Sequence, residues 1–351
     1  MSTIRLSICM PTHGFGTFIG ETLSSIVTQA PEDVQIIVVD GGSTDNTESV
    51  VRRFQATFPR LVFHRRERNM GLDRDLALAV ELAEGTYCWL MSSDDVVKPH
   101  AIDRILKEIQ LGHDVYLCNR TECDKNLNPI RDRRWVSRTS ADHVFSFSSK
   151  LHLIEYLDRA QSLGALFSYI SSIIVRRTQW LDTNYDEAIT GTNYAHVYRI
   201  FRILLAKGTL KYIIDPLVLC RGSNDSFLHK GLLNRMFIDI NGYGLLANKL
   251  FVEEDVRQAF KAVMRRQNAW FLLPGVRSRV RDKEGWKELE AKLLAYGYNR
   301  AQLWFIETVG SWKLIVAVAR VLRRGTAGLQ RMIRRLGRQA SLHPRNCLKG
   351  A

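Results

Sequence analysis

The sequence predicts an α/β fold, built on a doubly wound parallel sheet and followed by a mostly helical C-terminal region. Two observations predict it. Over roughly the first 120 residues, short apolar runs alternate with segments of helical spacing, and Val34–Asp40 is a continuous β-branched run typical of a buried parallel strand. After Gly231 the spacing is mostly helical. A sheet formed by such alternation binds its ligands at the carboxyl ends of the strands.

Each element follows from local spacing and from its end signals. The expected strands are Leu6–Met10, Val34–Asp40, Leu61–His64, Thr86–Met91 and Asp114–Cys118. The expected helices are Thr17–Gln29, Asp45–Phe58 (capped by Ser43 or Asp45), Gly71–Ala83 and Pro99–Gln110. From Thr121 to about Ser149 we expect polar, Arg-rich loop, and mixed structure resumes with Leu151–Leu163, Trp180–Tyr185 and Tyr194–Ala206. We therefore expect a catalytic domain over residues 1–230 and a helical region over 231–351.

Composition favours an ordinary globular protein. The apolar fraction is 46% and the charged fraction 25%. The six cysteines lack the spacing of a zinc site, which favours reduced thiols in a cytosolic protein. The N-terminal residues show no signal-peptide pattern, and no run is long enough to span a bilayer. Most of the net charge of +14 lies after Arg300, whereas a nucleic-acid binder would spread it more evenly.

Two adjacent carboxylates, Asp94 and Asp95, close the expected strand Thr86–Met91. A hard divalent cation binds carboxylate oxygens and keeps part of its coordination shell for phosphates. Mg²⁺ or Mn²⁺ at this place would neutralise a departing nucleoside diphosphate and act as a Lewis acid. The alternative is a helix cap before Pro99.

Two further segments suit a nucleotide. Asp40 ends a strand, where it could accept a hydrogen bond from a base N–H, and the small residues after it leave room for a ligand. Pro11, Thr12 and His13 follow the first strand, in a turn that could hold ribose or base. The alternatives are a plain strand-to-helix turn and a surface loop histidine.

Together these motifs, in this order, resemble glycosyltransferase family 2, which has the GT-A fold. The residues that carry the resemblance are SICMPTHG, VVDGGSTDNT, NMGLDRD and SSDD, between Leu6 and Asp95. The resemblance implies that Pro11, Thr12 and Asp40 hold the nucleotide of a nucleoside-diphosphate sugar. It also implies that the segment with Asn69, Gly71 and Arg74 approaches the diphosphate or donor sugar, and that Asp94 and Asp95 engage the metal. The sequence departs from the family at Gly41, where a second acid is more common, and at His13-Gly14.

The middle region resembles enzymes that add side sugars to bacterial O-antigen units, abequosyltransferase-like proteins among them. In the family, a carboxylate pair often supplies the general base, but the comparable string here is Gly191–His196, without carboxylates. His196 has a suitable intrinsic pKa of about 6.5, and Asp186 and Glu187 are the other candidates. The alternative for His196 is a packed helix histidine. Arg221 lies in a string that resembles the loop closing over the phosphates, and its guanidinium could bind the diphosphate.

The C-terminal tail separates basic from apolar residues on a helical wheel. Between Lys313 and Arg338, eight basic residues fall on one side and a Leu/Ile/Val/Met stripe on the other, at roughly 100° per residue. We expect this tail (about 311–338) to lie on an anionic membrane surface, on the inner face of the plasma membrane, where a lipid-linked oligosaccharide acceptor would be found. The alternative is a helix that packs on the catalytic domain.

A different class is a nicotinamide oxidoreductase. Gly14 and Gly16 follow the first strand, and Asp40 ends the second, as in a dinucleotide-binding fold. The fingerprint G-x-G-x-x-G would need its third glycine at Ile19, and this interpretation leaves Asp94 and Asp95 without a role. A P-loop NTPase is excluded, because no G-x-x-x-x-G-K-[ST] string occurs.

Overall fold

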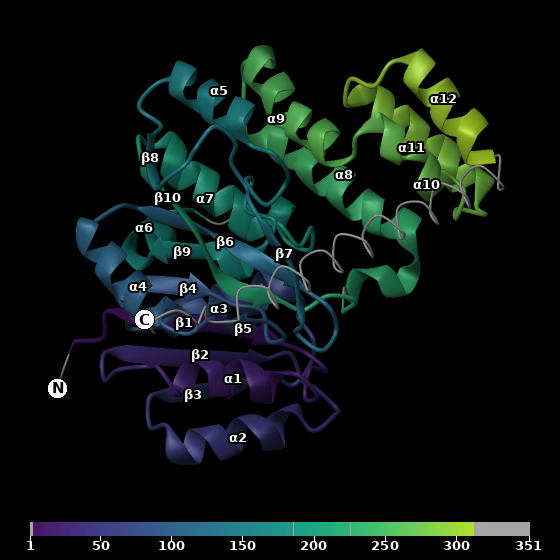
Figure 1. Ribbon diagram of the computed structural model, residues 1–351. Coiled ribbons are helices and arrows are strands. Elements are labelled where there is room, and N and C mark those ends of the chain that lie inside the picture. The colour runs from purple at the N-terminus through teal and green to yellow at the C-terminus, as the bar shows by residue number, and fades with distance from the viewer. Residues whose placement is uncertain (1–2, 185, 225, 312–351) are drawn as a thin grey trace, which may run out of the picture. The chain divides into compact units, whose positions relative to one another are not determined.

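A computed structural model describes residues 3–184, 186–224 and 226–311 (Figure 1), in two compact units, Met1–Gln267 and Asn268–Ala351. The strands are β1 (Leu6–Thr12), β2 (Val34–Asp40), β3 (Leu61–Arg65), β4 (Tyr87–Leu90), β5 (Val96–Val97), β6 (Val115–Cys123), β7 (Pro129–Arg133), β8 (His143–Ser146), β9 (Ile173–Arg176) and β10 (Thr209–Cys220). The helices of the first unit are α1 (Ile19–Val27), α2 (Thr47–Thr57), α3 (Leu72–Glu81), α4 (Ala101–Glu108), α5 (Lys150–Arg159), α6 (Arg177–Asp182), α7 (Ala195–Leu205), α8 (Leu232–Leu250) and α9 (Glu254–Gln267). The second unit contains α10 (Pro274–Arg277), α11 (Lys283–Ala295) and α12 (Arg300–Ser311).

The strands form one mixed sheet in the order β3-β2-β1-β4-β9-β6-β10-β5, with β7 and β8 paired at its side. The pairs β2–β3, β1–β2 and β1–β4 are parallel, which confirms the predicted α/β fold for the first four strands. Beyond β4 the sheet is not the parallel one expected, because β9 enters antiparallel between β4 and β6. The chain therefore joins a parallel half-sheet to a second half of mixed direction.

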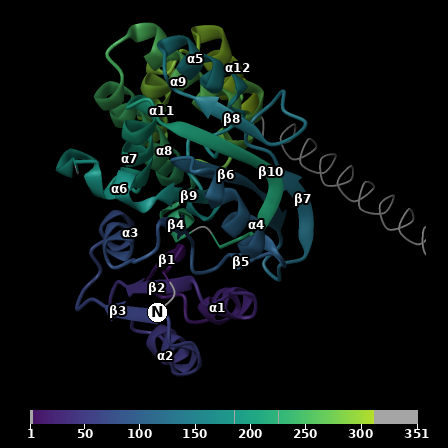
Figure 2. The ribbon, with the colours of Figure 1, turned by 90° about the vertical axis from the view of Figure 1, so that its left-hand side faces the viewer.

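Strands β1 and β2 are buried at every position, as their continuous apolar runs predict. One face of the sheet packs on α1, α2 and α4 through an apolar core that includes Ile8, Ile36 and Trp89. The other face receives α3, where the Cys9 thiol donates to the carbonyl oxygen of Ala79. Figure 2 shows α1 and α3 on opposite sides of these strands. Helices on both faces leave the carboxyl edge of the strands as the place where polar residues can gather.

The segment expected as loop between Thr121 and Ser149 contains the end of β6 and the strands β7 and β8. Strand β7 is largely exposed and charged, and Arg131 pairs with Glu122 across β6. An exposed strand at the side of a sheet can carry charge on both faces, so it lacks the alternation by which strands are recognised. The sequence prediction of a loop here was therefore wrong.

Helices α8 and α9 belong to the first unit. The ring of Phe260 in α9 contacts that of Phe201 in α7 edge to face and also contacts the ring of Tyr243 in α8. Helix α9 also packs on α5. The proposed domain boundary near residue 230 stays a prediction, since packing within the unit does not show which part folds alone.

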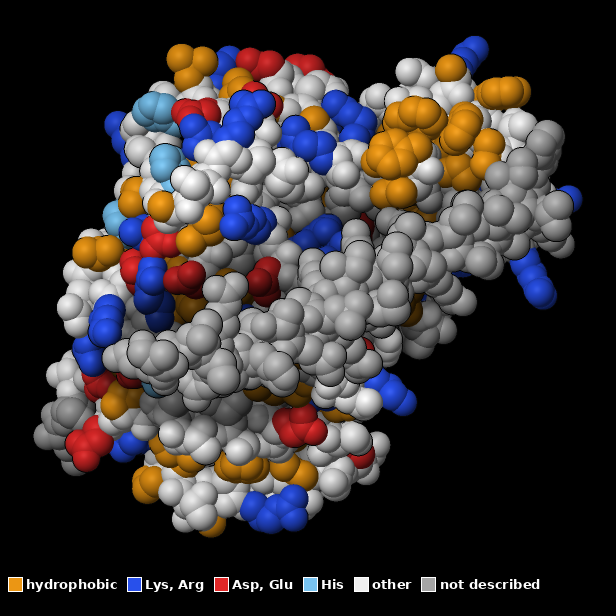
Figure 3. Space-filling model, in the orientation of Figure 1, with side chains coloured by type: hydrophobic (Ala, Val, Ile, Leu, Met, Phe, Trp, Pro, Cys, Tyr) orange, Lys and Arg blue, Asp and Glu red, His pale blue; other side chains and the backbone are white. Residues whose placement is uncertain are grey.

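In the second unit, Trp286, Leu289 and Ile306 are buried, and Arg277 pairs with Glu307 to join α10 and α12. Figure 3 shows hydrophobic side chains gathered on the surface of this unit. Its large exposed ones are Trp270, Phe271, Leu272, Leu294 and Trp304. None of the helices that the structure describes has the length and apolarity to cross a membrane. The expected amphipathic tail, about residues 311–338, lies outside the described residues except for Ser311.

Candidate nucleotide and metal site

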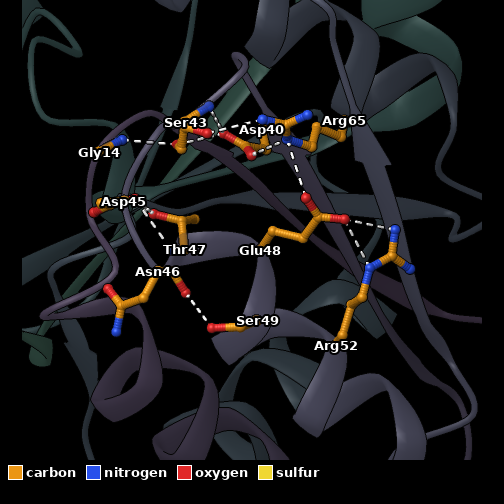
Figure 4. A network of polar contacts seen from close by, with 10 residues as sticks. All are labelled: Gly14, Asp40, Ser43, Asp45, Asn46, Thr47, Glu48, Ser49, Arg52 and Arg65. Carbon is orange, nitrogen blue, oxygen red and sulfur yellow. Dashed lines mark hydrogen bonds and ion pairs between the residues drawn. The ribbon is translucent and has the colours of Figure 1, made fainter.

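The carboxyl ends of β1 and β2 lie side by side, with Thr12 paired to Asp40 in the parallel register. Asp40 is fully buried, and its Oδ1 accepts hydrogen bonds from the Ser43 backbone N–H at 3.0 Å and from the Ser43 hydroxyl at 2.5 Å. The Ser43 hydroxyl oxygen accepts from the Gly14 N–H at 2.8 Å, so the turns after both strands are held together (Figure 4). This network fixes the edge of the sheet that the sequence assigns to the nucleotide.

Two buried oxygens at this edge find no hydrogen-bond donor among the described residues. They are Oγ1 of Thr12 and Oδ2 of Asp40, although Arg65 Nε lies 3.5 Å from the latter (Figure 4). Buried polar atoms are normally hydrogen-bonded, and an orphan often marks a ligand site. Their pairing in register supports a ligand at the ends of β1 and β2. Pro11, also buried, precedes Thr12 in the same strand.

The second proposed donor segment lies between β3 and α3. The side-chain oxygen of Asn69 accepts from the Gly71 N–H at 2.8 Å, and Gly71 has a φ of 86°, which favours glycine. Arg74 contacts Glu187 at 3.0 Å. Asp73, to which the NMGLDRD motif gave no separate role, accepts from the N–H groups of Gly191 and Asn193 at 2.9 Å each and of Ala195 at 3.1 Å. The start of α3 therefore holds the turn that precedes α7.

Asp94 and Asp95 lie buried just beyond β4, at 9% and 2% exposure. Oδ2 of Asp95 accepts from the hydroxyls of Tyr169 at 2.7 Å and Ser171 at 2.6 Å. Burial, followed by the charge of Asp94, raises the pKa of Asp95 to about 7, although the two hydroxyls lower it. Burial also raises the pKa of Asp94, which accepts from Ser92 and Asn224.

This donor set fits a divalent cation. Two adjacent buried carboxylates repel each other, and a cation between them and a phosphate would remove that cost. Asp95 Oδ1 has a single contact in the described residues, the Arg221 N–H at 3.3 Å, so it retains accepting capacity. The part of the chain that the structure describes holds no cluster of three or more His, Cys, Asp or Glu residues suited to a metal. The pair would therefore share its ion with phosphate and water, as Mg²⁺ usually requires.

Arg221 is buried beside the carboxylate pair. Its guanidinium donates to the backbone oxygens of Asp94 at 3.1 Å and Lys125 at 2.8 Å, and to Glu21 at 2.6 Å. These contacts fix the loop after β10 against the acid pair. The role in diphosphate binding stays a prediction.

Arg120 in β6 is a further residue of this site, which no motif in the sequence indicates. Its guanidinium lies 4.3 Å from the ring centre of Tyr169 and 5.1 Å from that of Trp135. Its Nε is buried without a hydrogen-bond partner in the described residues, and its charge is one of those that lower the pKa of Asp95. A cation so close to the acid pair offsets part of its negative charge.

The three base candidates have different surroundings. His196 is 3% exposed, its Nε2 lies 2.9 Å from the Phe167 carbonyl oxygen, and burial lowers its pKa to about 4. Asp186 lies 3.1 Å from Lys249, which lowers the pKa of Asp186. Glu187 is exposed and contacts Arg74. This arrangement favours the packing interpretation of His196, and no contact here tests the catalytic assignment of any of the three.

Of the two glycines that suggested a dinucleotide fold, Gly16 serves packing, whereas Gly14 has a positive φ of 72°. A Cβ on Gly16 would lie 2.1 Å from the Asn46 side-chain oxygen, and the Gly16 N–H donates to Asp45 at 2.9 Å. Asp45 also accepts from the backbone N–H of Thr47 at 3.1 Å (Figure 4). The N-cap of α2 is nevertheless Asn46, so the prediction that Ser43 or Asp45 caps this helix was wrong. Gly16 therefore permits a close approach of α2 to the turn after β1.

Comparisons with known proteins agree with the motif order. The model of the family described as Glycosyl transferase family 2 matches residues 7–223. The chain is 36% identical to abequosyltransferase RfbV of Salmonella typhimurium over 273 residues. This aligned region covers 76% of this chain and 81% of the relative.

Solved structures show the same fold. TarS 1–349 of S. aureus in complex with UDP-GlcNAc has a TM-score of 0.62 at 15% identity, over 92% of each chain. The mannosyltransferase PcManGT from Pyrobaculum calidifontis, in complex with GDP-Man and Mn²⁺, has a TM-score of 0.53 at 15% identity, over 90% of this chain and 87% of that one. At such identities the likeness shows the fold alone, a GT-A-like mixed sheet with helices.

Proposed function

The chain belongs to glycosyl transferase family 2, and from that premise we propose that it is a metal-dependent transferase of O-antigen synthesis. It moves a hexosyl or deoxyhexosyl group from a nucleoside-diphosphate sugar to a hydroxyl of a lipid-linked oligosaccharide. The observation that carries the proposal is the buried pair Asp94–Asp95, at the same sheet edge as the orphan oxygens of Thr12 and Asp40. Membership of this transferase family excludes the alternative function considered from the sequence, a nicotinamide oxidoreductase.

The donor would lie along this edge. Thr12 and Asp40 would bind the nucleoside, and Asn69, Gly71 and Arg74 would face the diphosphate or sugar. Arg221 and Arg120 supply positive charge beside the two aspartates. The Arg221 guanidinium donates to the backbone oxygen of Asp94. Mn²⁺ or Mg²⁺ held by Asp94 and Asp95 would neutralise the leaving diphosphate.

The reaction would be a direct displacement at the sugar C1 with inversion. The acceptor oxygen forms a bond to C1 as the bond from C1 to the diphosphate oxygen breaks, and a base removes the hydroxyl proton. Glu187 is the candidate whose carboxylate is both exposed and in contact with the donor segment, through Arg74. Asp186 and His196 remain the other candidates.

The acceptor would be bound at the cytosolic membrane face. The 36% identity to an abequosyltransferase supports a saccharide acceptor, and the amphipathic basic tail supports a position on the membrane surface. Exposed aromatic side chains of the second unit, Trp270, Phe271 and Trp304, suit the same interface.

The metal assignment is tested with Asp95→Ala. This variant should lose transfer and bind nucleoside diphosphate more weakly, because the diphosphate loses its counter-ion; Asp94→Ala should behave alike or slightly more mildly. Calorimetric binding and turnover are measured with Mn²⁺ and then with EDTA. Asp103→Ala, which removes an exposed acid from α4, is the matched control. Full activity of Asp95→Ala, or indifference to EDTA, would contradict the proposal.

A further inference from the structure

The backbone of Gly41, directly after β2, faces a carboxylate from a distant part of the chain. A Cβ on Gly41 would lie 2.9 Å from Oδ2 of Asp75, 3.5 Å from Oδ1 of Asn69 and 3.6 Å from the His13 Cβ. Asp75 belongs to α3, and the other two belong to the segments after β1 and before α3. The Asp75 carboxylate therefore occupies space that a side chain at position 41 would fill.

One oxygen of the Asp75 carboxylate is hydrogen-bonded and the other has no hydrogen-bond donor among the described residues. Asp75 is 3% exposed, and its Oδ1 accepts from Arg66 Nε at 2.6 Å. Arg66 is itself fixed, because its backbone N–H donates to the Asp40 carbonyl oxygen at 2.8 Å. No donor to Oδ2 of Asp75 occurs in the described part of the chain. A buried carboxylate is costly unless its oxygens are hydrogen-bonded, so this oxygen is available to a ligand.

Asp40, like Asp75, has one carboxylate oxygen that accepts a hydrogen bond and one that accepts none from the part of the chain that the structure describes. Its Oδ1 is bound by Ser43, and its Oδ2 is buried without a hydrogen bond within the described residues. Asp40 directly precedes Gly41, whose Cβ position lies 2.9 Å from Oδ2 of Asp75. In keeping with this, the charge of Asp40, after burial, contributes to raising the pKa of Asp75. Two carboxylates, one ending β2 and one from α3, thus flank Gly41 at the sheet edge where the nucleoside is expected.

We propose that Asp75 acts together with Asp40 as an acceptor for the base of the donor nucleotide, and selects a base with an exocyclic amino group. Two carboxylate oxygens match two N–H donors, which guanine offers through its ring N–H and amino group, and cytosine through the two hydrogens of its amino group. Uracil offers one N–H between two carbonyl oxygens, and one of those carbonyls would face a carboxylate. The inference rests on the proposed use of a nucleoside-diphosphate sugar, and adds to it the class of base and the residue that selects it.

The experiment is titration calorimetry of the full chain with CDP, GDP and UDP in the presence of Mn²⁺. We expect CDP or GDP to bind more tightly than UDP. Asp75→Asn should weaken the tighter ligand about tenfold or more and reduce its advantage over UDP, because a charged acceptor is lost. Glu48→Gln, which removes a charge on the far side of Arg65, should leave all three affinities unchanged.

A rescue separates binding from folding. Gly41→Asp alone should weaken binding, because the new side chain collides with the Asp75 carboxylate. Gly41→Asp combined with Asp75→Ala puts a carboxylate back into the same space and should restore much of the affinity, which a folding defect would not do.

Two results would overturn the inference while the proposed function stands. The first is Asp75→Asn binding all three diphosphates as the wild type does, and the second is UDP binding as tightly as CDP and GDP. Absence of binding of any diphosphate to the wild type would overturn the proposed function and this inference with it.

Discussion

The carboxylate of Asp73 accepts a hydrogen bond from the backbone N–H of Asn193 at 2.9 Å, across 120 positions of the chain. It also accepts from Gly191 and Ala195, so one side chain at the start of α3 caps the turn that leads into α7. The adjacent Arg74 contacts Glu187. The segment proposed to bind the donor is thereby tied to the segment that contains the base candidates.

Replacing Asp73 should loosen this connection. Asp73→Ala leaves three backbone N–H groups without their acceptor, and we expect a loss of about 2 kcal/mol in the free energy of unfolding. Turnover should fall more than nucleoside diphosphate affinity, because the loop over 187–195 moves while the nucleoside contacts remain. Urea unfolding, calorimetry and turnover measure these effects. Asp73→Asn, which keeps one acceptor oxygen, should lie between the wild type and Asp73→Ala; equal stability of all three would contradict the capping role.

His196 should make stability depend on pH. Burial lowers its pKa to about 4, whereas an unfolded histidine has a pKa of about 6.5, so the unfolded state binds a proton first as the pH falls. The stabilisation is fully present above about pH 6.5 and is lost towards pH 4, by about 3 kcal/mol in total.

The measurement is the urea midpoint of unfolding at several pH values between 7 and 4. His196→Gln should lose stability less steeply over this range than the wild type, because glutamine does not take up a proton. His152→Gln, at an exposed position, should follow the wild type. Identical pH profiles of wild type and His196→Gln would show that His196 contributes nothing to the linkage.

The identity of the general base is decided by turnover at saturating donor. Loss of the base should lower turnover by about 10²-fold or more and leave donor binding almost intact. We compare His196→Ala, Asp186→Asn and Glu187→Gln, and expect the largest effect from Glu187→Gln because its carboxylate is exposed beside Arg74. If only His196→Ala shows this pattern, the histidine holds the role despite its burial. Arg74→Gln breaks the same ion pair and also removes a proposed donor contact, so it should weaken donor binding, whereas loss of a base at Glu187 should leave donor binding almost intact.

The parts of this structure that depend on local pattern were predictable. Val34–Asp40 forms a strand over the expected range, because burial on both faces makes a strand a continuous apolar run of neighbouring residues. The contacts of Asp73 and Arg120 were not predictable. They depend on which segments meet in space, and a lone aspartate or arginine has no spacing that shows its partner. Strand β9 was missed for a similar reason, since its four residues resemble any short apolar run.

The C-terminal tail provides the last prediction. Eight basic residues between Lys313 and Arg338 are segregated from an apolar stripe. Each Lys or Arg near an anionic leaflet contributes about 1 kcal/mol, and the stripe adds apolar burial. Removal of residues 311–351 should therefore release the protein from anionic liposomes. It should also abolish activity on a lipid-linked acceptor and spare activity on a short soluble analogue.

The matched control removes residues 339–351 only, which keeps the amphipathic stretch and should keep binding. Co-sedimentation with liposomes at low and high salt, together with both acceptor assays, measures the effect. High salt should release the intact protein only in part, because salt screens the charges and leaves the apolar burial. Equal sedimentation of the protein lacking 311–351 would exclude the tail as the anchor. If that variant is insoluble or unfolded, the stripe packs on the folded protein, because only a core face destabilises the chain when it is removed.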